Sequence, residues 1–211
     1  MMIAIDGPAA AGKGTLARRI ADTLGFAYLD TGSLYRATAK KILDNGIDQD
    51  DAAACANAAM TLTPVELASD GLRTEEVGQA ASKVSAIPEV RAALLEYQRN
   101  VAANPPEGKK GAVLDGRDVG TVVCPDADVK FFITASAEVR AERRYKELRE
   151  VDENAIYARV LKEMKERDER DSSRAVAPLK PADDATIIDS SGLNADQVFE
   201  QACDIIVAKR A

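Results

Sequence analysis

A run of small residues near residue 10 has the types and spacing needed to hold a polyphosphate. It reads Gly7, Pro8, Ala9, Ala10, Ala11, Gly12, Lys13, Gly14 and Thr15. Small residues let the backbone wrap closely around phosphate oxygens, while its N–H groups and the start of the following helix attract negative charge. Lys13 would reach the β- and γ-phosphates, and Thr15 offers a hydroxyl for Mg²⁺. The alternative, a glycine-rich turn without a ligand, is disfavoured by the full spacing and by the strand that precedes it.

Two later segments have the groups needed for a second anion. Asp30–Arg36 contains the hydroxyl of Thr31, the start of a predicted helix, Tyr35, and Arg36 one turn further on. These groups suit a monophosphate, although a capped helix with a solvated arginine is the alternative. Asp115–Gly120 follows a predicted strand; Arg117 could clamp a phosphate there, and Asp118 could accept a hydrogen bond from an exocyclic amine such as N4 of cytosine. A turn with an Asp–Arg ion pair is the alternative.

A third cluster is rich in arginine. Arg167, Arg170 and Arg174 are three and four residues apart, so they share one face if the helix continues that far. Three like charges repel each other unless an anion lies between them, which predicts a lid over a triphosphate; a solvated, salt-bridged face is the alternative. Arg140, Arg143 and Arg144 form a nearby run, from which we assign Arg143 to the ATP-binding residues.

The elements that must position these residues alternate along the chain. Short apolar strands are predicted at 2–5, 26–29, 112–114, 129–133 and 186–188, and helices at 16–24, 33–43, 50–60, 75–86, 88–102, 137–150, 153–168 and 195–209. This alternation predicts an α/β fold with a parallel central sheet, and thus three layers with helices on both faces. We expect one kinase domain over residues 1–211.

The composition narrows the chemistry. The chain contains no histidine, which excludes Ser-His-Asp and Cys-His catalysis and histidine-bound metals. The net charge of −7 argues against a nucleic-acid partner. Cys55, Cys124 and Cys203 are widely spaced, which favours buried thiols in a reducing compartment. We find no signal peptide and no membrane-spanning stretch, so we expect a cytoplasmic protein without a membrane partner.

Taken together, these blocks resemble the bacterial cytidylate kinases. Gly14 separates Lys13 from Thr15, as in the nucleoside monophosphate kinases, and the guanine-reading N-K-x-D motif of GTPases is missing from the sequence. The resemblance extends through Arg73-Thr74-Glu75, Asp115–Val123 and Arg167–Pro178, in the family's order and over nearly the whole chain.

The resemblance implies an architecture and residue roles. A core with a five-stranded parallel sheet carries a mobile monophosphate-binding region (37–90) and an arginine-rich lid (153–183). The family's cytosine contacts correspond to Ser82, Arg91 and Asp118; its contacts to the CMP phosphate to Arg36, Arg117 and Arg174; and its sugar contacts to Arg167 and Asp171. The sequence departs from the family's long form at 61–72, which is too short for the usual three-stranded insert, so we expect a loop or at most a hairpin there.

The reaction expected from the resemblance is transfer of the γ-phosphoryl group of ATP to CMP or dCMP, giving CDP or dCDP and ADP in pyrimidine nucleotide metabolism, with Mg²⁺, by a monomer. Lys13, Arg117, Arg167 and Arg174 would stabilise the charge on the moving group. Two alternatives remain: another P-loop small-molecule kinase, acting on UMP or a different acceptor, and a nucleotide-binding switch ATPase without an acceptor.

Overall fold

The computed structural model describes residues 1–150 and 153–210. Its centre is a five-stranded sheet in the order β2-β3-β1-β4-β5, in which all strands are parallel. The strands are β1 (Met2–Asp6), β2 (Ala27–Asp30), β3 (Ala112–Gly116), β4 (Val129–Thr134) and β5 (Thr186–Asp189). This confirms the predicted parallel α/β sheet.

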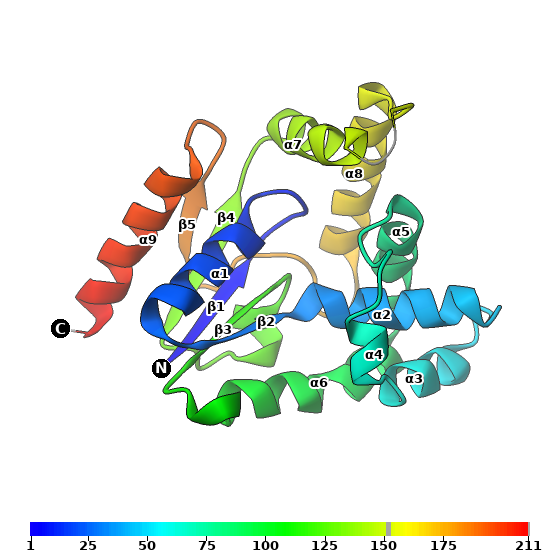
Figure 1. Cartoon of the computed structure of the whole chain (residues 1–211), viewed down its shortest axis with the longest axis horizontal. Coiled ribbons are helices and arrows are strands. Elements are labelled where there is room, and N and C mark those ends of the chain that lie inside the picture. Colours follow the sequence, from blue (N-terminus) through cyan, green and yellow to red (C-terminus); the bar gives the residue numbers. More distant parts are fainter. Residues whose placement is uncertain (151–152, 211) are drawn as a thin grey trace.

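Two helical layers cover the sheet (Figure 1). Ile3 and Ile5 of β1 point toward one face, where they pack with α1 (Lys13–Leu24) and α9 (Ala195–Arg210). Ala4, between them, packs on the opposite face with Ala102 of α6 (Pro88–Ala103) and with η2 (Val119–Val123), a single π-helical turn. Strands buried on both faces are the usual result of helical crossovers, so the three-layer prediction is confirmed.

A second group of helices forms a lobe beside the sheet (Figure 1). It consists of α2 (Thr31–Asp44), α3 (Ala52–Met60), the short α4 (Pro64–Leu67), α5 (Glu75–Val84) and part of α6. Its own apolar cluster includes Leu34, Ile42, Val84 and Leu94, each at most 3% exposed. The predicted monophosphate-binding region, 37–90, falls within this lobe.

The shortened segment at 61–72 contains a helix where we expected a loop or hairpin. Thr63 caps α4, Pro64 occupies its first turn, and the Glu66 carboxylate accepts a hydrogen bond from the backbone N–H of Thr63. This is a capping box with proline in the first turn, a pattern that favours a helix start over a strand. The expected loop or hairpin is therefore a loop that contains one short helix of four residues, and there is no strand in this segment, all of which the structure describes.

The two helices that remain among the described residues, α7 (Ala137–Arg149) and α8 (Tyr157–Ser173), lie near the carboxyl ends of the strands. A short 3₁₀ turn, η1 (Pro106–Gly108), follows the carboxyl end of α6. The helix predicted at 153–168 begins and ends later than expected. Residues 151, 152 and 211, which the predicted domain also includes, lie outside the described residues. None of the described helices is long and apolar enough to cross a membrane.

Candidate active site

The phosphate-binding loop lies between β1 and α1, as its sequence predicts. Gly7 has φ +145°, and a Cβ there would lie 1.9 Å from the carbonyl oxygen of Ile133 on β4, so only glycine fits. Gly12 has φ +95° and precedes α1 without a side chain that could cap the helix. The first N–H groups of α1 therefore face the loop as an anion-binding helix start.

Lys13 is buried at the foot of this loop and donates a hydrogen bond from Nζ to the carbonyl oxygen of Pro8, at 2.7 Å. Burial lowers the pKa of its ammonium group, and the neighbouring Arg117 lowers it further, against the opposing effect of Asp115 and Asp6. An anion in the loop would reverse this shift, because negative charge favours the protonated amine.

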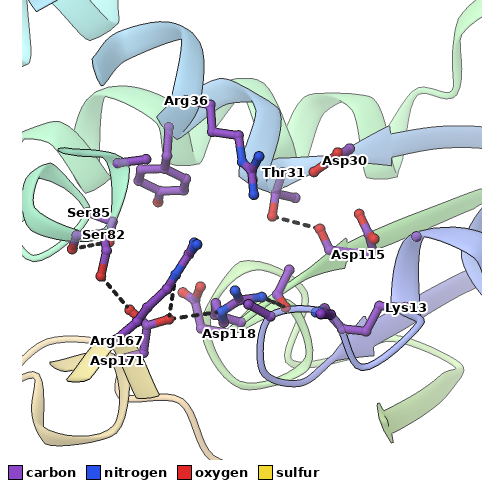
Figure 2. Close-up of a pocket in the computed structure, with 18 of the residues that line it drawn as sticks. Lys13, Asp30, Thr31, Arg36, Ser82, Ser85, Asp115, Asp118, Arg167 and Asp171 are labelled. Carbon is purple, nitrogen blue, oxygen red and sulfur yellow. Dashed lines mark hydrogen bonds and ion pairs between the residues drawn. The ribbon is translucent and has the colours of Figure 1, made fainter. Parts of the chain in front are cut away.

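The wall opposite Lys13 contains the ends of β2 and β3 (Figure 2). Asp30 caps α2 by accepting a hydrogen bond from the backbone of Ser33, and Thr31 donates to the carbonyl oxygen of Asp115, at 2.8 Å. Burial raises the pKa of the Asp115 carboxyl, and the negative charge of Asp30 raises it further. Two repelling carboxylates beside a phosphate-binding loop form a place where a cation is favoured.

Arginines converge on the same cleft from three parts of the chain. Arg36 comes from α2, Arg117 from the loop after β3, and Arg167 from α8. Burial lowers the pKa of Arg167 to about 9, with further lowering by Arg117 and Arg36. The Nε atoms of Arg167 and Arg174 are buried and have no hydrogen-bond partner among the described residues. The arrangement has the charge and the unused donors for a bound anion.

Asp171 of α8 organises this cluster. Its Oδ1 accepts a hydrogen bond from Ser82 of α5 at 3.1 Å, and its Oδ2 accepts one from Nε of Arg117 at 3.0 Å. Burial alone would raise the pKa of this carboxyl, but Arg117 and Arg167 outweigh it, and the pKa is lowered. The ionised Asp171 of α8 thus links α5 of the lobe to the loop that follows β3.

The far end of the cleft contains a buried ion pair between Arg91 of α6 and Asp118. The Arg91 guanidinium lies 5.5 Å from the ring centre of Tyr35 and donates to the carbonyl oxygen of Ser85 at 3.1 Å. Arg174 donates to the hydroxyl of Ser85, at 3.1 Å. A carboxylate, a guanidinium and hydroxyls at one end of an otherwise cationic cleft are groups that can read the edge of a base.

The structure brings most of the predicted residues into one cleft. It is lined by Ala9, Ala10, Lys13, Gly14, Thr31, Tyr35, Arg36, Ser82, Arg91, Arg117, Asp118, Arg167, Asp171 and Arg174. The predicted residues that do not line it are Gly7, Pro8, Ala11, Gly12, Thr15 and Arg143. Thr15 and Arg143 both line a second pocket, where Arg143 donates to the carbonyl oxygen of Ser190 at 2.8 Å. Thr15, which is exposed, also lines a third pocket that shares Lys13, Arg36 and Arg167 with the cleft.

Several residues of the cleft were not singled out from the sequence. Asp30 ends β2 and Asp115 is the last residue but one of β3, and the rule that ligands bind at the carboxyl ends of strands could have identified them. Ser85 had no such signal. Arg170, which the sequence grouped with Arg167 and Arg174, does not line the cleft. Arg170 reaches from α8 to Gln79 and Ser82 of α5, a contact that only the folded chain creates.

Comparison with known proteins gives the family. The cytidylate kinase family model matches residues 3–208. A cytidylate kinase of Paramagnetospirillum magneticum is 62% identical over 209 residues, covering 99% of each chain, and one of Rhodospirillum rubrum is 56% identical, covering 99% of this chain and 98% of the other. A solved structure of an uncharacterized protein from Eubacterium ventriosum shares the fold, with a TM-score of 0.54 at 16% identity and 98% coverage of each chain. The chain therefore belongs to the cytidylate kinase family, as its phosphate-binding loop and arginine-lined cleft predict.

Proposed function

We propose that this enzyme transfers the γ-phosphoryl group of ATP to CMP or dCMP, forming ADP and CDP or dCDP. The observation that carries the proposal is the cleft itself, in which a phosphate-binding loop faces converging arginines, with Asp118 and Arg91 at the far end. Two anion sites facing each other are what transfer between two phosphates requires. We also propose that the enzyme acts as a cytoplasmic monomer, without a nucleic-acid or membrane partner.

The donor would bind along the phosphate-binding loop, from Gly7 to Thr15. Lys13 and the start of α1 would hold the β- and γ-phosphates. The pocket lined by Thr15 and Arg143 also contains Leu16, Leu193 and Val198, which offer apolar surface for the adenine ring. This arrangement supports the assignment of Arg143 to ATP binding, at the base end of the donor and not at its phosphates.

The acceptor would lie between the lobe and the sheet edge. Arg36, Arg117 and Arg174 would hold its phosphate, and Arg167 and Asp171 its sugar. Asp118, with Ser82 and Arg91, would contact the base. A carboxylate accepts a hydrogen bond from the cytosine N4 amine, whereas uracil presents a carbonyl oxygen at the same position, which the carboxylate repels. The cleft therefore favours CMP over UMP.

The residues present also fit Mg²⁺, which prefers oxygen ligands and usually keeps several of its waters. Asp30 and Asp115 line the cleft beside Lys13 and Gly14, whereas Thr15 does not line the cleft itself but lines an adjoining pocket that shares Lys13 and Gly14 with it. We therefore propose that the two carboxylates hold the hydrated ion, with Thr15 as the alternative ligand. When bound, Mg²⁺ neutralises charge on the β- and γ-phosphates.

No general base is needed for this transfer. The acceptor phosphate has a second pKa of about 6 and is largely ionised at neutral pH, so its oxygen can attack directly. Lys13, Arg117, Arg167 and Arg174 would offset the repulsion between the two anions and the charge on the moving group. Closure of the lid, residues 153–183, would exclude water that could otherwise take the phosphoryl group.

A coupled assay for ADP release tests the proposal, with Mg·ATP and CMP, dCMP, UMP, AMP, GMP or shikimate as acceptor. We expect fast turnover with CMP and dCMP alone. Fast turnover with UMP would remove Asp118 as the determinant of base choice. Slow ATP hydrolysis that no acceptor accelerates would replace the proposal with a switch ATPase.

A further inference from the structure

Asp6 is a buried carboxylate that the mechanism above does not use. It ends β1, directly before the phosphate-binding loop, and is 3% exposed. Both of its oxygens accept hydrogen bonds from backbone N–H groups: Oδ1 from Val119 at 2.8 Å and Oδ2 from Gly120 at 2.7 Å. Burying a carboxylate costs folding free energy unless it is hydrogen-bonded in this way, which suggests that Asp6 has a function at this position.

The two N–H groups begin the turn η2, which starts immediately after Asp118. The first N–H groups of a helical turn have no partner within it and are usually capped by a nearby side chain. Here the capping side chain is Asp6 of β1, which is 113 residues from Val119 in the sequence. The turn in return fixes the Asp118 carbonyl oxygen, which accepts from Val122 at 2.8 Å.

A third hydrogen bond joins the same two segments. Arg117 donates from Nη1 to the carbonyl oxygen of Gly7, at 2.9 Å. Asp6 and Gly7 are thus tied to both sides of Asp118, by residues 117, 119 and 120. Asp118, between these anchored residues, lies at the cleft (Figure 2) and its side chain pairs with Arg91.

We propose that Asp6 is a positioning residue for the acceptor base: its carboxylate fixes the 117–120 loop so that Asp118 meets the exocyclic amine of the acceptor. The inference rests on the proposed function, because it assigns Asp6 a role in binding CMP. Asp6 itself lies behind the loop and would not touch either substrate.

Ionisation of Asp6 gives the proposal a pH signature. Burial raises the pKa of its carboxyl to about 6, although the hydrogen bonds from Gly120 and Val119 oppose the rise. The charged groups that face it are Asp118, which raises the pKa, and Lys13, which lowers it. Two other titratable groups are nearby: the Lys130 side chain, whose Nζ donates to Asp184, and the Cys124 thiol. Below about pH 6 the protonated oxygen can no longer accept freely, and the hold on the loop weakens.

The first test is Asp6→Asn, which keeps the size of the side chain but presents an amide N–H₂ to one of the two donors. We expect KM for CMP to rise about tenfold, because one charge-assisted hydrogen bond to the loop is lost, and KM for ATP to stay nearly unchanged. The matched control is Asp128→Asn, which removes a carboxylate that accepts from the N–H of Met2 at the other end of β1. The control should leave both KM values as in the wild type. Equal rises in both KM values for Asp6→Asn would overturn the proposal.

The pH profile separates positioning from general damage. The ratio of KM for CMP between Asp6→Asn and wild type should fall toward one between about pH 7.5 and about pH 5.5, because the wild-type carboxyl becomes neutral there. Titration of the CMP phosphate affects both proteins and cancels in the ratio. A ratio independent of pH would contradict a role for the ionised carboxylate.

A double-mutant cycle gives the decisive result. If Asp6 acts through Asp118, then Asp6→Asn adds little to KM for CMP once Asp118→Ala is present, whereas fully additive effects would refute the connection. Should Asp6→Asn fail to fold, Gly120→Ala perturbs the contact from the loop, since its Cβ would lie 3.3 Å from Asp6 Oδ2. That variant should show the same selective rise in KM for CMP, and no rise would overturn the proposal. Wild-type protein that does not phosphorylate CMP would instead refute the proposed function.

Discussion

Replacing Asp118 with alanine separates the structural and functional roles of one carboxylate. The side chains of Asp118 and Arg91 are 7% and 9% exposed, and removing one partner of a buried ion pair typically costs about 3–5 kcal/mol. Arg91 would keep its hydrogen bond to Ser85 and its position over the Tyr35 ring, so its charge would not be left without any partner. We therefore expect a loss at the lower end of this range, a fall of about 3 kcal/mol in the free energy of unfolding.

The same substitution should raise KM for CMP strongly while KM for ATP changes little. A hydrogen bond to a charged acceptor contributes about 1.5–3 kcal/mol, so KM for CMP should rise roughly 10- to 150-fold. KM for ATP should change by less than about threefold, because the donor does not reach Asp118 in the proposed arrangement. Asp118→Asn keeps an amide oxygen as acceptor and should show a smaller rise.

Urea unfolding gives the stability change, and steady-state assays with each substrate varied in turn give the two KM values. Thr38→Val is a matched control for stability: its hydroxyl is fully buried in α2 and bonded to the carbonyl oxygen of Leu34, away from the cleft. It should destabilise the protein by about 1 kcal/mol without changing KM for CMP. If Asp118→Ala raises both KM values equally, or if the control raises KM for CMP as much, the assignment of Asp118 to the base is refuted.

Four further outcomes follow from the site. Lys13→Ala should lower kcat about 10³-fold or more while far-UV circular dichroism stays unchanged, and wild-type activity would contradict the loop assignment. Asp115→Asn should raise the Mg²⁺ concentration needed for half-maximal rate more than Thr15→Val does. A larger effect of Thr15→Val would indicate that Thr15, and not Asp115, holds the ion. Arg143→Ala should raise KM for ATP and leave KM for CMP unchanged, as steady-state kinetics would show. Arg167→Met should raise Tm of the protein without nucleotides by about 2–4 °C, in a calorimetric scan that also shows weaker stabilisation by CMP; a lower Tm would argue against charge strain in the cleft.

The features that could be predicted are those determined by residues close together in the sequence. The phosphate-binding loop could be read locally because its backbone conformations require glycine at Gly7 and Gly12, and small residues between them. The strands could be read from short apolar runs. The end of α8 could not: the helix was expected to stop at 168 but continues to Ser173, because Asp171 is held by Ser82 and Arg117. Tertiary contacts here override the local pattern.

Contacts between distant segments had no local signal. Ser82 and Asp171 are separated by 89 residues, and Asp6 and Gly120 by 114. Ser82 and Arg91 were assigned only through the family resemblance, since neither differs in pattern from an ordinary helix residue. Asp6 was missed because an acidic residue at the end of a strand is read as the start of a turn, and its two hydrogen-bond donors become visible only when η2 packs beneath it.

The positive charge gathered in the cleft lowers the stability of the folded protein. Arg36, Arg117 and Arg167 each face the others across a few side chains, and burial together with this repulsion lowers the pKa of Arg36 and of Arg167. Asp171 offsets part of the repulsion, and its Oδ2 lies 3.9 Å from Nε of Arg167, but the buried Nε atoms of Arg167 and Arg174 have no hydrogen-bond partner among the described residues. Unsatisfied buried donors and like charges cost free energy that only an anion recovers. The unliganded protein is therefore strained where a second phosphate would bind, which is why removing Arg167 should stabilise it and at the same time reduce what the nucleotide can contribute.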